Sequence, residues 1–368
     1  MKKHMQLKIY RLLVLLTFAS CSSQNNPDLK SYIGIAVPGD SLHNYIESKR
    51  NQLNIPGLSF ALINEGQVVY HNTFGYSNKE EKKLVTDKTI FEAASLSKSV
   101  FAFFVMSYVE QGVLDLDRPL YKYLPYPDIE SDQRYKQITA RMVLSHRSGF
   151  PNWRENEPDG KLKIKFEPGT DYEYSGEGYQ YLAMVLKHIE KTDWSGLENS
   201  FQNKVAKPLG MVNSTFVPTS KTMSSKAEPY NEKGNRIDWE NSYWYKKDKS
   251  KFIAPASMHT EALDFSKWMI TVMHGQLLSK ESYKELFKHH SKTATTSSGM
   301  NIYYTLGFLN PDGKYSTVFI HDGNNEGFTS WFLLDIEKDW GYVIFTNSDN
   351  GGVLGNDLWN YFEKEDYN

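Results

Sequence analysis

The hydrophobic pattern is strongest between Phe91 and Gly112. Residues 100–109 are apolar almost all round, which predicts a helix buried on every side. A glycine such as Gly112 is typical of a helix C-terminus. Ser95 and Lys98 lie where this helix begins, three residues apart and therefore on one helix face. We expect a hydroxyl and an amine to meet at the N-terminus of a buried helix.

Shorter apolar runs between turn residues predict the other elements. Before the central helix we expect a helix over 41–51 and a hairpin with strands over 58–63 and 68–70; after it, helices over 138–144 and 178–189. The C-terminal part turns to strands, at 304–309, 317–320, 328–336 and 341–346, before a last helix over 356–363. Because their connections are short and rich in Gly, Asp and Asn, these strands should be antiparallel neighbours.

Length and composition narrow the class of protein. The chain has 368 residues, 40% of them hydrophobic, which is enough for one large domain or two closely packed lobes. Its formal net charge is −2, so no basic face is indicated and nucleic acid is not an expected partner.

The N-terminus has a different pattern. Residues 1–20 place basic residues before a short apolar run, which is typical of an export signal and too short to span a bilayer. The segment 18–21 resembles a bacterial lipobox, and its Cys21 is the only cysteine of the chain. We therefore expect a lipoprotein exported from a bacterial cell and anchored to a membrane through lipid on Cys21, with residues 21–37 as a tether. The alternative is a soluble secreted protein cut nearby.

The pair Ser95 and Lys98 also fits an activated serine nucleophile. A serine hydroxyl is a weak nucleophile at neutral pH and needs a neighbouring base or a poorly solvated amine. A helix N-terminus adds positive potential and free N–H groups, which suit developing negative charge. The motif is short, however, and an ordinary capped helix with a solvated lysine also carries it.

Other candidate groups are ambiguous when taken singly. Tyr174, at a loop-to-helix junction, fits a core residue or a base held near a cation. The segment 321–323 ends a strand, where a backbone can lie beside a substrate. His146, at a helix end, is interpreted as structural, and the pair at 289–290 is too isolated to indicate a metal site.

Taken together, three motifs stand in one order: Ser95-x-x-Lys98, Tyr174-x-Gly176 and His321-x-Gly323. This order resembles the penicillin-recognising serine hydrolases, in the branch that holds class C β-lactamases, serine DD-carboxypeptidases, esterases and D-aminopeptidases. The resemblance covers nearly everything after residue 38, including the segments 91–98, 112–125, 138–151, 166–181 and 208–210.

The resemblance implies an α+β fold of three layers. An antiparallel sheet is flanked by helices, a mostly helical lobe is inserted, and the active site lies between the lobes. The hydrolase domain would cover 38–368. Its sheet lobe would take about 38–114 and 251–368, and its inserted lobe about 115–250.

The resemblance also implies roles. Ser95 is the nucleophile, Lys98 eases its deprotonation, and Tyr174 is the general base, with its phenolate favoured by Lys98. The backbone N–H groups of Ser95 and Asn324 form the oxyanion hole. The motif His321-x-Gly323 takes the place of Lys-Thr-Gly beside the substrate. No metal or cofactor is needed.

Two departures from the family pattern bear on the substrate. Gly176 stands where an asparagine usually binds the substrate amide, and His321 stands where lysine is usual in β-lactamases. We therefore expect a serine hydrolase acting on an ester, amide or D-amino-acid peptide bond of a small-molecule or peptide substrate, and a poor β-lactamase. The alternatives are an acyltransferase and a sensor or binding protein that β-lactams acylate with little turnover.

Overall fold

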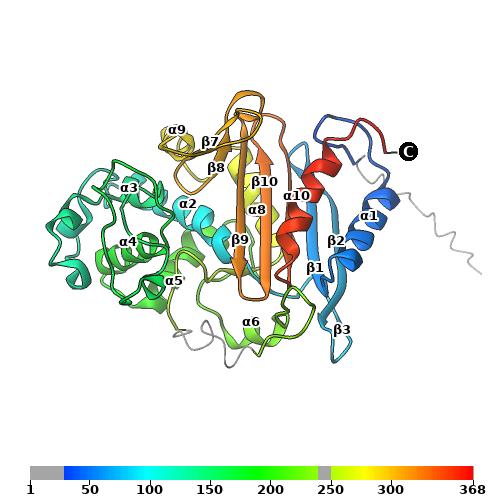
Figure 1. Ribbon diagram of the computed structural model, residues 1–368, viewed down its shortest axis with the longest axis horizontal. Coiled ribbons are helices and arrows are strands. Elements are labelled where there is room, and N and C mark those ends of the chain that lie inside the picture. Colours follow the sequence, from blue (N-terminus) through cyan, green and yellow to red (C-terminus); the bar gives the residue numbers. More distant parts are fainter. Residues whose placement is uncertain (1–28, 239–249, 368) are drawn as a thin grey trace, which may run out of the picture.

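The fold is built around one large antiparallel sheet (Figure 1). The computed structural model describes residues 29–238 and 250–367, so the expected signal peptide and Cys21 lie outside the described residues. Within them, nine strands form the sheet in the order β3-β2-β1-β11-β10-β9-β8-β7-β6, and β4 pairs with β5 in a separate two-stranded sheet. Every strand pairing is antiparallel, as expected from the short connections.

The strands are β1 (Gly57–Asn64), β2 (Gln67–Asn78), β3 (Lys83–Leu84), β4 (Phe91–Glu92), β5 (His259–Thr260), β6 (Ser291–Thr295), β7 (Asn301–Tyr304), β8 (Leu309–Pro311), β9 (Val318–Asn325), β10 (Phe328–Asp335) and β11 (Trp340–Thr346). The helices are α1 (Gly39–Gln52), α2 (Ser97–Glu110), α3 (Ala140–Leu144), α4 (Gly176–Ile189), α5 (Trp194–Phe201), α6 (Ser220–Ser225), α8 (Ala262–Met273), α9 (Lys280–Phe287) and α10 (Gly351–Phe362). Short helical turns are η1 (Ala94–Leu96), η2 (Leu120–Lys122), η3 (Pro127–Ile129), η4 (Gln133–Gln137), η5 (Arg154–Asn156), η6 (Gln202–Ala206) and η8 (Gly313–Tyr315).

Helices cover both faces of the sheet, which gives the three layers. Successive residues of a strand point to opposite faces. In β1, Phe60 and Leu62 therefore pack into the core beneath α1 and α10, whereas Ala61 and Ile63 pack into the core shared with α2 and α8. This explains why β1 is buried along its whole length and reads as a continuous apolar run.

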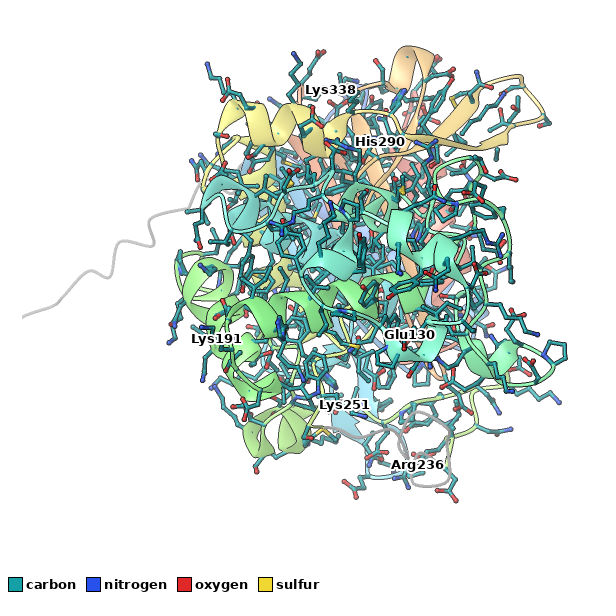
Figure 2. The ribbon with its side chains drawn as sticks, turned by 90° about the vertical axis from the view of Figure 1, so that its left-hand side faces the viewer. Glu130, Lys191, Arg236, Lys251, His290 and Lys338 are labelled. Atoms are coloured by element: carbon teal, nitrogen blue, oxygen red, sulfur yellow. The ribbon has the colours of Figure 1, made fainter. Side chains whose placement is uncertain are left out.

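The helical lobe lies beside the sheet, on the far side of α2. Figure 1 shows α3, α4 and α5 away from the strands, and Figure 2 shows this lobe from outside, with Glu130 and Lys191 at its surface. The expected α+β architecture, an antiparallel sheet flanked by helices with a helical lobe, is thus confirmed. The central helix is also confirmed, since α2 is buried over most of its length.

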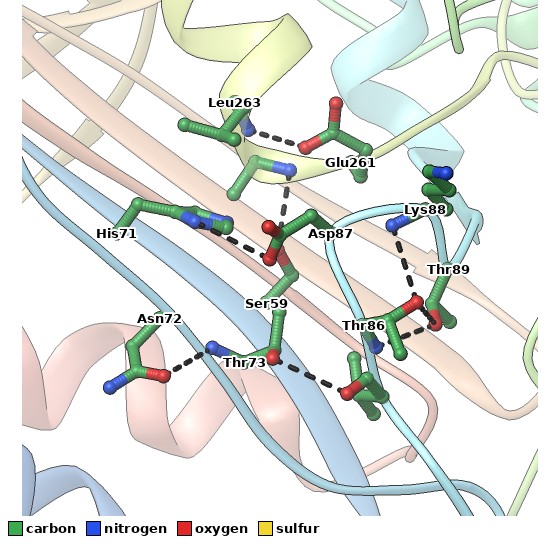
Figure 3. A network of polar contacts seen from close by, with 12 residues as sticks. Ser59, His71, Asn72, Thr73, Thr86, Asp87, Lys88, Thr89, Glu261 and Leu263 are labelled. Carbon is green, nitrogen blue, oxygen red and sulfur yellow. Dashed lines mark hydrogen bonds and ion pairs between the residues drawn. The ribbon is translucent and has the colours of Figure 1, made fainter. Parts of the chain in front are cut away.

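A polar network fixes the segment that leads into β4 (Figure 3). Thr73 Oγ1, on β2, donates to the Val85 carbonyl at 3.3 Å, and Thr86 N donates to Thr89 Oγ1 at 2.9 Å. At the start of α8, Glu261 caps the helix by accepting from Leu263 N at 2.6 Å. The Thr73 contact holds the stretch before the candidate nucleophile against β2, and the Thr86 contact fixes the turn within it.

One predicted strand is wrong. Residues 304–309 do not form a continuous strand, because β7 ends at Tyr304 and β8 begins at Leu309. Between them Gly307 adopts φ 92°, and a Cβ on it would lie 2.7 Å from the Ala102 side chain of α2. The Gly307 carbonyl accepts from Ser99 Oγ at 2.6 Å. Close docking onto α2, which apolar patterning does not reveal, interrupts the strand. The last helix also begins earlier than expected, at Gly351.

The N-terminal segment 29–37 packs against the domain. Tyr32 is buried, and its hydroxyl donates to Asp335 Oδ2 at 2.9 Å. Lys30 and Ala36 form an isolated antiparallel bridge. This part of the expected tether is therefore folded onto the sheet lobe. Among the described residues, no helix has both the length and the apolar character needed to cross a bilayer.

Candidate active site

The candidate nucleophile lies at a tight turn between β4 and α2. Ser95 is in η1 and keeps part of its surface exposed, although both its chain neighbours are buried. Ala94, directly before it, has φ 46°, a left-handed conformation that costs energy for a residue other than glycine. The carbonyl of Ala93 holds the turn by accepting from Ser330 Oγ at 2.8 Å and Leu96 N at 3.0 Å. The fold thus stabilises a strained turn that presents one hydroxyl.

Lys98 is buried beside this hydroxyl. Its Nζ donates hydrogen bonds to Ser95 Oγ and to the Pro255 carbonyl, each at 3.0 Å, and lies 4.5 Å from the centre of the Tyr174 ring. Burial lowers the pKa of Lys98 to about 7, against the opposing effect of the Asp322 charge. A large share of the amine is therefore uncharged at neutral pH, with its lone pair available to accept the Ser95 proton.

Tyr174 contacts the same hydroxyl. Burial raises the pKa of Tyr174 well above its usual value, a hydrogen bond with Ser95 lowers it, and the Asp322 charge raises it further. The group is therefore a neutral phenol in the resting protein, which differs from the expected phenolate. In their uncharged forms, the amine of Lys98 is the better proton acceptor and the phenol of Tyr174 the better proton donor.

His321 lies on β9 with both ring nitrogens occupied. Its Nε2 lies 2.9 Å from the Tyr304 hydroxyl, and its Nδ1 lies 2.6 Å from the backbone carbonyl of Asp322. Since a carbonyl only accepts, Nδ1 carries the proton and Nε2 accepts from Tyr304. Burial lowers the pKa of His321 to about 4, so the ring is neutral at pH 7. It supplies no positive charge for a substrate carboxylate.

Gly323 lets β9 approach the nucleophile. A Cβ there would lie 2.6 Å from the Ala93 carbonyl oxygen and 3.0 Å from Ser95 N, so a side chain would push the strand away. Beyond Ile320, β9 has no partner on the β8 side, because Leu309↔Ile320 is the single pairing between the two strands in the described residues. The edge of β9 is therefore open beside Ser95.

The register of β9 places Asn324 at this open edge. A two-residue turn joins β9 to β10, with Asn325 opposite Phe328 and Asn324 opposite Thr329. In an antiparallel ladder, hydrogen-bonded and non-hydrogen-bonded pairs alternate, so Asn324 directs its backbone N–H away from β10. This N–H and that of Ser95 lie on adjoining backbone segments, which suits an oxyanion hole.

A side chain that the sequence analysis did not single out fills the space beside Gly176. The Gly176 N–H donates to Asn152 Oδ1 at 3.0 Å. A Cβ on Gly176 would lie 2.8 Å from the Asn152 carbonyl oxygen and 3.1 Å from the Trp153 ring. The carboxamide of Asn152 thus lies against Gly176, with its oxygen already engaged by the Gly176 N–H. Asn152 lies 24 residues earlier in the chain, so no local pattern pointed to it.

His146 supports Tyr174 from behind. It is fully buried with φ 58°, its Nδ1 accepts from Ser175 N at 3.0 Å, and its ring centre lies 4.3 Å from that of Tyr174. Burial and the charge of Lys98 lower the pKa of His146 well below its usual value. This neutral ring fixes the loop that carries Tyr174. In the described part of the chain, no three His, Cys, Asp or Glu side chains gather as metal ligands.

A buried ion pair lies behind the open edge. Lys226 Nζ contacts Glu92 Oε1, and Asn325 Nδ2 donates to Glu92 Oε2 at 2.5 Å and to the Ala256 carbonyl at 3.2 Å. Burial raises the pKa of Glu92, but Lys226 and His259 outweigh that effect and keep it below its usual value. The pair therefore ties the strand before Ser95 to the residue after Asn324.

Comparison with known proteins agrees with this geometry. The family model described as "Beta-lactamase" matches residues 42–363, which is most of the chain. The chain belongs to the β-lactamase family. Its fold is similar to an octameric penicillin-binding protein homologue from Pyrococcus abyssi, with a TM-score of 0.73 and 22% identity over 88% of this chain and 77% of that one. It is also similar to the D-alanine carboxypeptidase AmpC from Burkholderia cenocepacia, with a TM-score of 0.70 and 17% identity over 88% and 98%.

Curated relatives of this β-lactamase-family chain are distant. Protein flp of Staphylococcus aureus strain N315 is 23% identical over 321 residues, which cover 82% of this chain and 61% of flp. The putative penicillin-binding protein PbpX of Bacillus subtilis strain 168 is 25% identical over 308 residues, which cover 80% of this chain and 71% of PbpX. The chain thus spans about three fifths of the length of flp. The family is one of serine hydrolases, and the particular activity is a separate question.

Proposed function

We propose that this protein hydrolyses an ester, amide or D-amino-acid peptide bond through an acyl-enzyme on Ser95. The observation that carries the proposal is the 3.0 Å separation between Lys98 Nζ and Ser95 Oγ, in surroundings that lower the pKa of the amine to about 7. An uncharged amine at that distance is an adequate base for a serine hydroxyl.

The geometry supports a two-step reaction. Ser95 Oγ bonds to the substrate carbonyl carbon while its proton passes to Lys98, and the N–H groups of Ser95 and Asn324 receive the oxyanion. The bond from that carbon to the leaving oxygen or nitrogen then breaks. Tyr174 donates its phenolic proton to the leaving group and recovers one from Lys98. Water, deprotonated by the same pair, then releases the acyl group and frees Ser95.

Simple esters and amides fit this site better than β-lactams. His321 is neutral, and among the described residues no lysine or arginine takes its place on β9 to bind a substrate carboxylate. Gly176 has no side chain to bind the amide of an acylamino arm on a β-lactam. A substrate amide buried without a hydrogen-bond partner loses about 1–3 kcal/mol, roughly tenfold to a hundredfold in selectivity. The similar structure from Burkholderia cenocepacia is described as a carboxypeptidase, which supports a peptide bond as a second candidate.

Two alternatives share the acyl-enzyme. An acyltransferase would pass the acyl group to an acceptor other than water, and a sensor would retain it. Intact mass after incubation with a labelled penicillin distinguishes them: rapid return to the parent mass supports a hydrolase, and a persistent adduct supports a sensor. Return to the parent mass only when an amine or alcohol acceptor is added supports a transferase.

The decisive experiment is labelling by a fluorophosphonate together with hydrolysis of p-nitrophenyl acetate. Ser95→Ala should abolish both. The matched control is Ser107→Ala, which removes another serine of α2, one that bonds only the Phe104 carbonyl in the described residues. If Ser95→Ala still hydrolyses the ester at near the parent rate, the proposal is wrong. Ser97 is a poorer control, because its Oγ accepts from the buried Met258 N at 3.1 Å.

We further propose that the enzyme works outside the bacterial cytoplasm, anchored through lipid on Cys21. The support is the basic and apolar pattern of residues 1–20, followed by the only cysteine of the chain. Bacterial lipoproteins carry several acyl chains, and more than one chain is needed for stable anchoring.

A further inference from the structure

Asp322 is an exposed acid at the mouth of the candidate active site. It lies on β9 between His321 and Gly323, both buried, and next but one to Asn324. Its backbone is fixed, because its carbonyl accepts from His321 Nδ1 at 2.6 Å and because it pairs with Trp331 of β10. Asp322 therefore stands on a rigid strand whose edge is open beside Ser95, and its charge acts on the Lys98 amine.

The charge of Asp322 is uncompensated within the described part of the chain. Three acids that lie close in sequence to Ser95 and Tyr174 are paired: Glu92 with Lys226, Glu173 with Lys165 at 2.9 Å, and Glu177 with Arg154 at 2.8 Å. No such ion pair joins Asp322 to a side chain of residues 29–238 or 250–367.

The other titratable groups of the site do not neutralise this charge. His146 and His321 are neutral at pH 7, Tyr174 is a neutral phenol, and much of Lys98 is uncharged. The field of Asp322 reaches Lys98 on α2 and both Tyr172 and Tyr174 on the loop before α4. The site therefore presents a net negative potential to an incoming substrate.

We propose that Asp322 makes this enzyme select substrates with a cationic group, such as a free amine, close to the scissile bond, and reject those with a carboxylate there. The inference rests on the proposed function and names its substrate class. An ammonium gains attraction from Asp322. The carboxylate that a penicillin or a free C-terminal residue carries is repelled by the same charge, which narrows the peptides of the proposed function to those with an amine near the scissile bond.

A matched series of inhibitors tests the charge without a known substrate. Boronic acids form a reversible bond to a nucleophilic serine and imitate its tetrahedral intermediate. The series is the boronic acid analogue of D-alanine with a free amine, its N-acetyl derivative and its N-succinyl derivative, which are cationic, neutral and anionic. Each is measured by how strongly it slows fluorophosphonate labelling of Ser95, at low and at high salt.

The parent should bind the cationic member about tenfold or more tighter than the anionic one, since unit charges a few ångströms apart near a protein surface interact strongly. High salt should shrink this ratio. Asp322→Asn should reduce it to within about threefold, and the neutral member should still protect Ser95 from labelling, which also shows that the variant folds. The matched control Glu326→Gln removes an exposed acid at the tip of the same hairpin and should leave the ratio intact.

The outcomes separate the two proposals. If the parent binds all three members equally, or if Asp322→Asn keeps the parent ratio, the charge selection is wrong while the serine hydrolase stands. If Glu326→Gln lowers the ratio as much as Asp322→Asn, the effect is one of overall charge and the assignment to Asp322 is wrong. If Ser95 is not labelled in the parent, the proposed function itself fails.

Discussion

Lys98 Nζ lies 3.0 Å from the carbonyl oxygen of Pro255, a residue 157 positions further along the chain. The same nitrogen lies 3.0 Å from Ser95 Oγ, so the carbonyl aims the amine at the nucleophile. Because a carbonyl can only accept, one N–H of the amine is always engaged, which leaves the lone pair of the neutral form free to face Ser95.

The first prediction concerns pH. Burial lowers the pKa of Lys98 to about 7, and only its uncharged form accepts a proton. We expect kcat/KM for p-nitrophenyl acetate to fall about tenfold per pH unit below 7 and to level off above about pH 8. His321, with a pKa of about 4, adds no second step in this range. A flat profile between pH 5 and 8 contradicts Lys98 as the base.

The second prediction is that Lys98 and Tyr174 act as one unit. Lys98→Met and Tyr174→Phe should each reduce kcat by about 10²–10⁴, the usual range for loss of a general base or acid. The double variant should cost little more than either single change, because groups that work together are not additive. Steady-state kinetics of the four proteins gives the coupling. Losses that multiply would mean that the two groups act independently.

The third prediction concerns substrate choice. On purified protein, kcat/KM for short-chain p-nitrophenyl esters should exceed that for nitrocefin, because His321 is neutral and Gly176 has no side chain to bind an acylamino arm. Nitrocefin turnover near 10⁶ M⁻¹s⁻¹ or above, with negligible esterase activity, would overturn this expectation.

The fourth prediction is that the space beside Gly176 is filled by Asn152 rather than empty. Gly176→Ala should destabilise the protein by about 1–3 kcal/mol, since its Cβ would meet the Asn152 carbonyl oxygen at 2.8 Å. The matched control is Gly352→Ala, where a Cβ meets nothing within 4 Å. Denaturant unfolding measures both. Unchanged stability in Gly176→Ala would show that Asn152 moves aside, and Gly176→Asn would then be a fair test of the missing asparagine.

The fifth prediction concerns membrane attachment. Expressed in a bacterial host, the full chain should partition with membranes, and Cys21→Ala should release it to the soluble fraction. Fractionation and the mass of the mature N-terminus give the answer. Unmodified parent protein in the soluble fraction, with an N-terminus other than residue 21, would refute the lipid anchor.

The sequence predicted the parts of the site that lie in short motifs. Ser95 and Lys98 share a helix face, and their contact follows from three-residue spacing alone. The family resemblance, rather than spacing in the chain, predicted that Tyr174 and His321 belong to the same site. The structure places their rings 6.2 Å apart. Asn152 and Pro255 were missed, because each reaches the site through packing between segments distant in the chain.

Charge states were harder to foresee than positions. The expected Tyr174 phenolate assumed that Lys98 stays charged beside it, but burial disfavours the charged form of both groups at once. Burial depends on how the lobes pack, and no pattern of residue types in the motifs records it. The same holds for the break at Gly307, where an apolar run was read as one strand.

Gly307 joins three elements through adjacent backbone atoms. Its carbonyl accepts from Ser99 Oγ of α2 at 2.6 Å, its N–H donates to the Leu144 carbonyl at the end of α3 at 3.1 Å, and Leu306 N beside it bonds the Leu286 carbonyl of α9 at 3.1 Å. Because residues 306 and 307 are hydrogen-bonded to three helices, this segment cannot work as a hinge. Opening the helical lobe away from the sheet would break these bonds together, so the amides of 306 and 307 should exchange with solvent only when the whole domain unfolds.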